Sequence, residues 1–248
     1  MSNNLIKKAF QLRNKTLDKF YAMGEAHLGG SFSMIEILIF LYYRLISNND
    51  KFILSKSHAS VPYLILLRDL GYKPKFKTHL ELDKKNKIYC TTGSLGHGLP
   101  ISVGFALANK LKNKEGIVFV LISDGECQEG TTWESLLLAN KFKLNNLVIL
   151  IDYNKIQALT SIKEGLPLNN LIKKFKAFNI DTINIVDGHS FAEMKKKIKL
   201  KNLIRTTAII FNTIKCKGIR EFENDPIWHA KKIRKTEYEI AKKSLKVL

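Results

Sequence analysis

Two polar clusters could act on one ligand, because each directly follows an apolar run. Asp124 and Gly125 come after the run at 117–122, and Asn154 comes after the run at 147–151. Ligands of open parallel sheets bind beyond the carboxyl ends of the strands, so Asp124 and Asn154 converge if these strands are neighbours. A carboxylate, an amide oxygen and a nearby main-chain carbonyl suit Mg²⁺ that also holds phosphate oxygens. Gly125 would let the backbone approach a diphosphate, and the next helix would offer its N-terminus to the same anion.

The elements that must position these residues follow from hydrophobic periodicity. Apolar runs predict strands at 52–54, 117–122, 147–151, 182–186 and 207–211. Helical spacing predicts helices at 5–24, 34–46, 59–70, 99–112, 131–143, 168–178 and 190–200, with loops at 71–92 and 93–98. This alternation is typical of an α/β fold, a parallel sheet with helices on both faces. No linker divides the chain, so we expect a single domain over 1–248, with a basic C-terminal extension from about residue 231 as a peripheral helix or frayed tail.

Composition excludes several classes of protein. The 248 residues are 45% hydrophobic and 25% charged, which is ordinary globular usage and argues against disorder or a fibre. Three cysteines without a CxxC pair make neither a disulfide framework nor a structural zinc site, and they favour a reducing, cytoplasmic setting. No signal peptide and no apolar run near about 20 residues is present, so no membrane partner is expected.

The net charge of +19 raises nucleic acid as a partner. The lysines are scattered along the whole chain, however, and Asn and Ile are abundant with them, which favours solvated lysines and no nucleic-acid site. An acidic partner chain or an anionic substrate would use the same positive field.

Six blocks in a fixed order carry a family resemblance. They are AHLGGS (26–31), LSKSHAS (54–60), TGSLGHG (92–98), SDGECQEGTTWE (123–134), DGH (187–189) and TIKCKG (213–218), the last followed by WH (228–229). Asp124 and Asn154, 30 positions apart, also match the spacing of the thiamine diphosphate signature, with Ser123 in place of its first glycine. From about Phe10 to His229 the chain resembles the transketolase family. It looks like the separate N-terminal subunit of a transketolase split over two chains.

The resemblance implies thiamine diphosphate and Mg²⁺ as cofactors. It also implies the thiamine diphosphate-binding fold, and within it the domain that binds the diphosphate. Asp124, Asn154 and the carbonyl of Ile156 would hold the metal. Further cofactor contacts are implied for His58, Gly93, Ser94, Leu95, His97, Gly125, Glu126 and His229. Catalytic positions along the substrate channel are implied for His27, His58, His79 and His229. Glu129 and Glu134 would couple the two cofactor sites across the dimer.

Histidine suits these catalytic positions, because proton transfer at sugar oxygens near neutral pH needs a group with a pKa near 6.5. Other residues have simpler interpretations. His79 lies in a loop with weaker local identity, and His189 is interpreted as a hydrogen-bonding residue at a strand end. We expect Trp133 and the run Leu136–Leu138 in the core, and Cys127 and Cys216 as packed thiols.

Three further departures from the family pattern leave the sugar open. His97 stands where many transketolases have Gln, and Ala26 and Ser57 replace frequent glycines. The implied reaction is transfer of a two-carbon ketol unit from a ketose to an aldose or its phosphate. A second chain would carry the pyrimidine-binding domain, in an α₂β₂ assembly.

Other functions stay open at this point. One alternative is a specialised thiamine diphosphate enzyme that forms acyloins or unusual sugars for surface polysaccharides, and another is the α subunit of a 2-oxoacid dehydrogenase. A basic nucleic-acid-binding protein and a catalytically silent scaffold complete the alternatives. The residues name neither the sugar nor the pathway.

Overall fold

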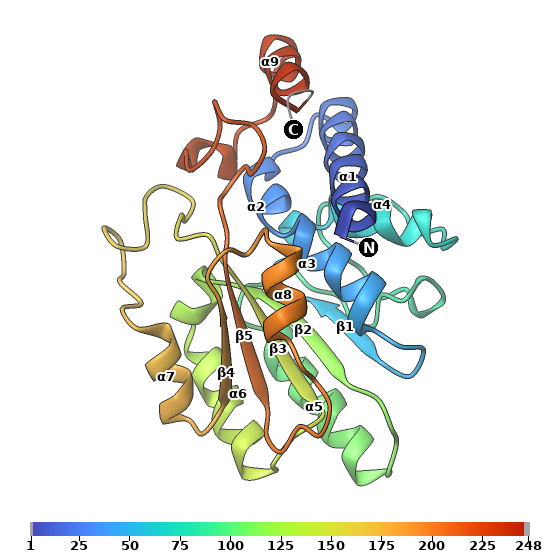
Figure 1. The fold of residues 1–248 in the computed structure, drawn as a ribbon, viewed down its shortest axis with the longest axis vertical. Coiled ribbons are helices and arrows are strands. Elements are labelled where there is room, and N and C mark those ends of the chain that lie inside the picture. The colour runs from blue at the N-terminus through green and yellow to red at the C-terminus, as the bar shows by residue number, and fades with distance from the viewer. Residues whose placement is uncertain (1, 246–248) are drawn as a thin grey trace.

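The computed structural model describes residues 2–245, and its centre is a five-stranded parallel sheet (Figure 1). The strands are β1 (Lys51–Leu54), β2 (Val118–Ser123), β3 (Leu147–Tyr153), β4 (Asp181–Ile185) and β5 (Thr207–Asn212), in the order β1-β2-β3-β5-β4. β2 and β3 are therefore neighbours, as the convergence of Asp124 and Asn154 requires. The strands predicted from apolar runs are confirmed to within about two residues at each end.

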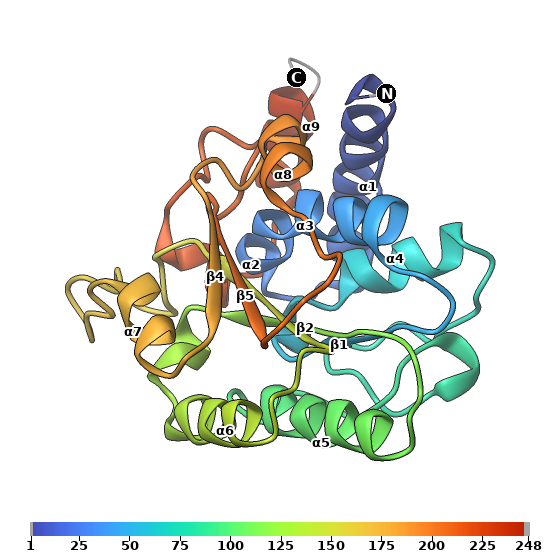
Figure 2. The same ribbon diagram turned by 60° about the horizontal axis from the view of Figure 1, so that its bottom comes forward.

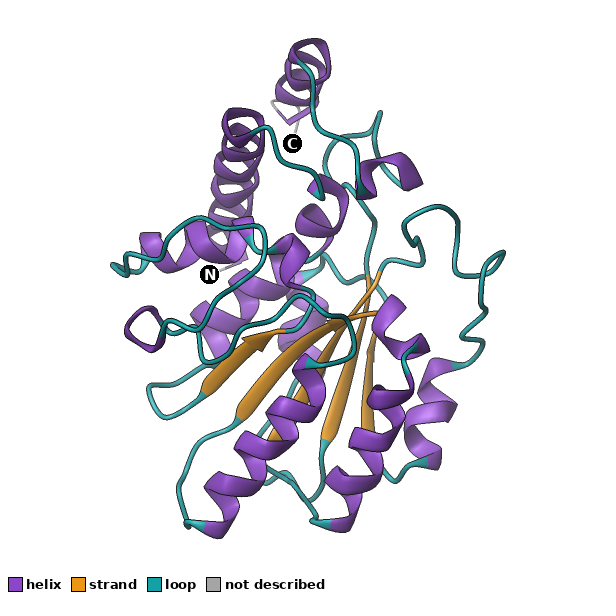
Figure 3. Ribbon diagram, turned by 180° about the vertical axis from the view of Figure 1, so that it is seen from behind, coloured by secondary structure: helices purple, strands orange, loops and turns teal. Residues whose placement is uncertain are grey.

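Helices cover both faces of the sheet, which confirms the predicted α/β architecture. α5 (Gly98–Leu111) and α6 (Gly130–Lys141) form the layer below the sheet in Figure 2, and α7 (Leu171–Ala177) extends the same core beside β4. The other face is covered by α1 (Ser2–Met23), α2 (Leu28–Ser33), α3 (Ile35–Phe40), α4 (Val61–Asp69) and α8 (Phe191–Lys197). In Figure 3, seen from behind, α5 and α6 cross in front of the strands. Within residues 2–245, no helix combines the length and hydropathy needed to cross a bilayer.

Burial on both faces explains why the strands read as continuous apolar runs. Along β2, Phe119 and Leu121 point into the core under α1–α4, while Val118, Val120 and Ile122 point into the core under α5 and α6. Successive strand residues face opposite sides of the sheet, so a strand covered on both sides has no position for a solvated polar residue. Polar residues are accordingly concentrated just beyond the strand ends, where the chain leaves the two cores.

The structure differs from the predicted helices in a few places. α2 is a separate short helix that the sequence pattern did not reveal, and the helix predicted at 34–46 finishes in a π-helical turn over Leu41–Leu45. The prediction that Leu136–Leu138 is core was wrong for two residues, because Leu137 is 60% and Leu138 47% exposed. Adjacent residues of a helix point about 100° apart, so three in a row cannot all face the sheet. Cys127 and Cys216 are buried, as expected.

The basic C-terminal extension is a peripheral helix over the residues that the structure describes. α9 (Lys235–Leu245) packs on α1, where the rings of Tyr21 and Tyr238 stack with centroids 4.3 Å apart. Ala241 and Leu245 are fully buried, so this helix is part of the packed structure. Residues 246–248 of the predicted extension lie outside the described residues.

Two glycines of α5 test how tightly this layer is packed. A Cβ on Gly98 would lie 2.7 Å from Cα of Ser55, whereas a Cβ on Gly104 would meet nothing within 4 Å. We expect Gly98→Ala to lower the free energy of unfolding by about 1–3 kcal/mol through overpacking. The control Gly104→Ala should raise it by about 0.5–1 kcal/mol, because alanine favours the helix. Urea denaturation measures both, and equal shifts in the same direction would contradict this packing.

Candidate active site

A pocket of about 380 Å³ opens at the carboxyl ends of β2 and β3, and we call it the strand-end pocket. Its lining comes from loops that are far apart in the sequence, and consists of Gly30, Lys56, His58, Leu95, Ser123, Asp124, Gly125, Gln128, Glu129, Asn154, Ile156, Gln157, Ala158, Leu159, Thr160, Lys215 and His229. A neighbouring hollow of about 570 Å³ shares Asn154 and Ile156, but no histidine or carboxylate of residues 2–245 lines it. The groups able to do chemistry are therefore concentrated in the strand-end pocket.

Asp124 joins the loops that follow β2 and β3. Its Oδ1 accepts a hydrogen bond from the N–H of Gly125 at 2.9 Å, and its Oδ2 accepts one from the N–H of Lys155 at 2.6 Å. The side chain is only 3% exposed. Burial, and then the negative charge of Asp152, raise the pKa of Asp124 to about 7. A cation bound here would relieve this electrostatic cost and favour the ionised carboxylate.

The oxygen donors predicted for Mg²⁺ all line the strand-end pocket. They are the carboxylate of Asp124, the amide oxygen of Asn154, which accepts from the N–H of Ile156 at 3.1 Å, and the carbonyl of Ile156. Such oxygen ligands suit Mg²⁺, with the rest of its octahedron coming from phosphate and water. Among the described residues, no group of three or more His, Cys, Asp or Glu side chains could hold a metal unaided. The donor set therefore fits a magnesium ion that is shared with a diphosphate.

The backbone beside this donor set leaves room for an anion. A Cβ on Gly125 would have only Ser123 Oγ near it, at 3.8 Å, so this glycine faces open pocket and no protein atom crowds it. The amide N–H of Gly125 already serves Asp124 within the turn. These features fit the close approach of a diphosphate that the sequence predicts for Gly125.

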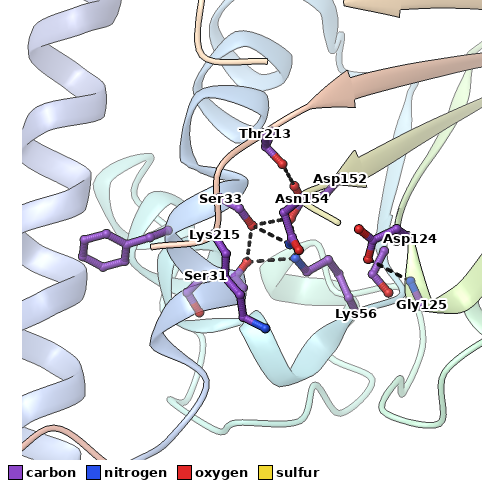
Figure 4. A network of polar contacts seen from close by, with 12 residues as sticks. Ser31, Ser33, Lys56, Asp124, Gly125, Asp152, Asn154, Thr213 and Lys215 are labelled. Atoms are coloured by element: carbon purple, nitrogen blue, oxygen red, sulfur yellow. Dashed lines mark hydrogen bonds and ion pairs between the residues drawn. The ribbon is translucent and has the colours of Figure 1, made fainter. Parts of the chain in front are cut away.

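Two lysines that we did not predict as site residues also reach the strand-end pocket. Lys56 donates to the carbonyl of Gly30 at 2.8 Å and to Asp152 Oδ2 at 2.6 Å (Figure 4). Lys215 donates to the carbonyls of Ile156 and Gln157 at 3.2 and 2.9 Å. Burial, and then the charge of Lys56, lower the pKa of Lys215 to about 8. Two ammonium groups beside one opening favour an anion.

Asp152 anchors the floor of the strand-end pocket. Besides Lys56, it accepts hydrogen bonds from the hydroxyl of Ser33, at 2.5 Å, and from the hydroxyl of Thr213 (Figure 4). Ser33 also accepts a longer hydrogen bond, of 3.4 Å, from the amide of Asn154. One fully buried carboxylate thus ties the ends of α2, β3 and β5 together beneath the predicted metal ligands.

Three of the predicted histidines form a cluster. The ring centroids of His27, His58 and His229 lie 5.2, 5.3 and 5.5 Å apart, and the last two rings line the strand-end pocket. Burial, and then the charge of Lys56, lower the pKa of His58 well below its usual value. Burial, and then Lys215, lower the pKa of His229 to about 4. The imidazoles of His58 and His229 are therefore neutral near pH 7, and their pKa values lie below the 6.5 expected from the sequence.

His27 is held in an unusual backbone conformation. It begins α2 with φ of 74°, in the left-handed region that non-glycine residues rarely adopt. Its ring Nδ1 is buried and has no hydrogen-bond partner among the described residues. Burial lowers the pKa of this imidazole as well. His27 is not among the residues that line the strand-end pocket, so this unpartnered nitrogen lies outside the pocket wall.

His79 and His97, like His27, do not line the strand-end pocket. His79 is exposed and packs against Gly93, where an added Cβ would lie 2.8 Å from its Cδ2. His97 is exposed at the start of α5, and its Nδ1 lies 3.3 Å from the hydroxyl of Ser94 and 3.1 Å from the carbonyl of Leu95. Of this loop, only Leu95 reaches the pocket wall.

The three predicted glutamates have different surroundings. Glu126 is fully buried and accepts from the hydroxyl of Ser55 and from the amides of Gly96 and Ser123, so its carboxylate braces the pocket wall from behind. Glu129 is exposed at the pocket rim, and Glu134 is exposed on α6. Exposure leaves both free for the coupling role that the resemblance implies.

Comparison with known proteins agrees with this fold and with its family. Residues 6–247 match the family described as "Transketolase, thiamine diphosphate binding domain". An apulose-4-phosphate transketolase subunit from Actinobacillus succinogenes is 33% identical over 98% of this chain and 96% of its own length. The 6-deoxy-6-sulfo-D-fructose transketolase subunit SqwG of a Clostridium species is 31% identical over 87% of this chain and 86% of its own.

A solved structure confirms the fold. The transketolase of Campylobacter jejuni superposes on 99% of this chain with a TM-score of 0.85 at 24% sequence identity. The chain spans 43% of the length of that enzyme. The family match over almost all residues, together with the likeness to full-length relatives, shows that this chain belongs to the transketolase family and contains its thiamine diphosphate-binding domain.

Proposed function

We propose that this chain is the cofactor-holding subunit of a split transketolase, and that it transfers a two-carbon ketol unit from a ketose to an aldose. One observation carries the proposal. The strand-end pocket places the oxygen donors of Asp124, Asn154 and Ile156 beside the ammonium of Lys215 and the neutral histidine cluster. This arrangement would bind a diphosphate that carries a metal ion, and it would place imidazoles beside the hydroxyls of a sugar.

In this proposal the chain's own residues hold the diphosphate and the metal. Asp124, Asn154 and the carbonyl of Ile156 would bind Mg²⁺, and Lys215 would contribute positive charge beside it. Lys56 lies beneath, and its ammonium is held by Asp152. The chemistry that thiamine diphosphate supplies when bound is addition to a ketose carbonyl and storage of the electron pair when a carbon–carbon bond breaks.

The histidine cluster would move protons at the oxygens of the sugar. His58 and His229 have lowered pKa values, so they are unprotonated near pH 7 and would act as weak bases toward a sugar hydroxyl. After accepting a proton from it, the same low pKa makes each imidazolium ready to return the proton. His27, whose ring lies against those of His58 and His229, would be the third histidine of the substrate channel. His79 would act farther out along the channel.

A separate partner chain is part of the proposal. Two relatives that this chain matches over most of their length are named as transketolase subunits. Leu159 lies on the pocket wall yet is 92% exposed. Leu137 and Leu138 are also exposed, on α6. These exposed apolar side chains support a partner whose surface covers them. The partner would contribute the pyrimidine-binding domain, in an α₂β₂ assembly. The three free thiols support a reducing, cytoplasmic setting.

A more specialised sugar is the second candidate for the substrate. Both of these relatives are named for uncommon ketoses, apulose 4-phosphate and 6-deoxy-6-sulfo-D-fructose. His97 stands close to Leu95 of the pocket wall, where it could alter the preference. Assaying the assembled enzyme on a panel of phosphorylated, sulfonated and branched ketoses separates this candidate from the pentose phosphates.

The metal site can be tested on the chain itself. Asp124→Asn removes the single carboxylate assigned to Mg²⁺, so thiamine diphosphate with Mg²⁺ should no longer raise the melting temperature. When the free cofactor concentration is about 100 times its Kd, binding should stabilise the parent chain by about 2.7 kcal/mol. Asp181→Asn, at an exposed strand end, is the control and should respond like the parent. Equal thermal shifts for Asp124→Asn and the parent would exclude this site.

The role of His58 can be tested in the enzyme assembled from both chains. His58→Ala should lower turnover by about 10²–10⁴-fold, the usual contribution of a proton-transfer group. The Kd of the cofactor should change by less than about tenfold, or ~1.4 kcal/mol. His58→Gln keeps a hydrogen-bonding group, but its amide has no basic nitrogen, so this variant should be as impaired as His58→Ala. Wild-type turnover in His58→Gln would assign His58 to hydrogen bonding alone.

The requirement for a partner has a direct test. Purified alone, this chain should show no ketol transfer at saturating thiamine diphosphate and Mg²⁺. The carboxylate that activates the aminopyrimidine ring of the cofactor would lie in the pyrimidine-binding domain, which belongs to the partner. Activity should appear when the co-purifying partner chain is added. Robust activity of the chain by itself would refute the split enzyme.

A further inference from the structure

The block at 187–189 belongs to the family resemblance but has no part in the proposed reaction. It follows β4, and its histidine takes part in a chain of polar contacts that starts in α1. Arg13 binds Glu36 of α3 with its Nη2 at 2.8 and 2.9 Å from the two carboxylate oxygens. His189 Nδ1 lies 2.8 Å from Glu36 Oε2, and the N–H of Ile214 donates to His189 Nε2 at 2.9 Å. The prediction that His189 is a hydrogen-bonding residue is confirmed.

The protons of this relay follow from its charges. Burial alone would raise the pKa of Glu36, but Arg13 and His189 outweigh it and lower the pKa to about 2. The carboxylate is therefore ionised, and the proton between Glu36 and His189 belongs to Nδ1. Because Nε2 accepts from a backbone N–H, it carries no proton, which defines one tautomer. The three side chains are at most 9% exposed, so this arrangement is held inside the protein.

The imidazole of His189 holds the chain segment that carries Lys215. Gly188 donates to the carbonyl of Asn212 at 2.7 Å, and a Cβ on Gly188 would collide with that carbonyl, so this turn is pressed against the end of β5. His189 then binds the amide of Ile214, one residue before Lys215. Lys215 extends from there to the carbonyls of Ile156 and Gln157 in the strand-end pocket. The course of the backbone at Ile214 therefore decides where the ammonium of Lys215 lies.

We propose that His189, oriented by Glu36 and Arg13, is a positioning residue for diphosphate binding, and that it acts by fixing the Ile214 amide so that Lys215 points into the strand-end pocket. The inference rests on the proposed function, because it assumes that the pocket holds the diphosphate. His189 does not line the pocket, so its effect on the ligand must pass through Lys215.

Two substitutions of His189 separate its two hydrogen bonds. The side-chain amide of Gln reaches the position of Nε2, so His189→Gln keeps an acceptor for the Ile214 amide. The shorter side chain of Asn reaches only the position of Nδ1, so His189→Asn keeps a partner for Glu36 and loses the bond to Ile214. If positioning is the role, the Gln variant resembles the parent and the Asn variant does not.

The binding experiment is a double-mutant cycle. Calorimetry measures the Kd of thiamine diphosphate with Mg²⁺ for the parent chain, His189→Asn, His189→Gln, Lys215→Met and His189→Asn/Lys215→Met. We expect His189→Asn to weaken binding about three- to tenfold, as expected for the loss of one hydrogen bond, and His189→Gln about twofold at most. In the Lys215→Met background, His189→Asn should have no further effect, because its influence passes through that lysine.

A second readout needs no cofactor. Amide hydrogen exchange of the peptide covering 212–217 should accelerate in His189→Asn and stay at the parent rate in His189→Gln. If His189→Asn does not fold, Glu36→Gln replaces it in the cycle. Without the carboxylate of Glu36, the proton of His189 is no longer held on Nδ1. This variant should therefore also weaken cofactor binding, but only where Lys215 is present.

The outcomes distinguish this inference from the proposed function. A parent chain that binds no thiamine diphosphate even when its partner chain is present overturns the proposed function and this inference together. A parent chain that binds, with unchanged affinity in His189→Asn, overturns the inference alone. The same holds if His189→Asn weakens binding equally with and without Lys215, because the effect is then general to the fold.

Discussion

The buried ion pair between Lys56 and Asp152 is the interaction on which the strand-end pocket depends. Both side chains are almost completely removed from water, and burying two charges is favourable only when their remaining hydrogen-bonding positions are filled. Here Asp152 also accepts from Ser33 and Thr213, and Lys56 also donates to the carbonyl of Gly30. The pair therefore connects Gly30, Ser33 and Thr213, which are far apart in the sequence, through hydrogen bonds.

The charges around this ion pair would suit an anion and a cation bound together in the strand-end pocket. Asp152 makes the neighbouring Asp124 harder to ionise, which leaves that carboxylate receptive to a metal. Lys56 disfavours the protonated forms of His58 and Lys215. The cluster is thus a balance in which each group shifts its neighbours. A diphosphate carrying Mg²⁺ would satisfy both the buried carboxylate and the lysines, and would leave the imidazoles neutral for the sugar.

Buried carboxylates also hold the chain segments that lie behind the strand-end pocket. Glu126 braces the loops at Ser55, Gly96 and Ser123 on one side. On the other side, Glu36 and His189 hold the segment before Lys215. Both supports are buried carboxylates that receive hydrogen bonds from parts of the chain far apart in sequence. Loops at the end of a parallel sheet lack the ladder of strand hydrogen bonds, so their positions depend on such side chains.

The sequence by itself determined the sheet and the first contacts of the site. Runs buried on both faces leave only apolar residues in the strands, so their positions could be read directly, and Asp124 and Asn154 follow from the ends of two such runs. The tertiary structure alone decided the roles of Lys56 and Lys215, because lysine is common in this chain and is usually solvated. It also separated the clustered histidines from His97, and it joined Glu36 to His189 across 153 positions. Periodicity reports which face of an element is buried, whereas a polar contact between loops depends on how the whole chain is packed.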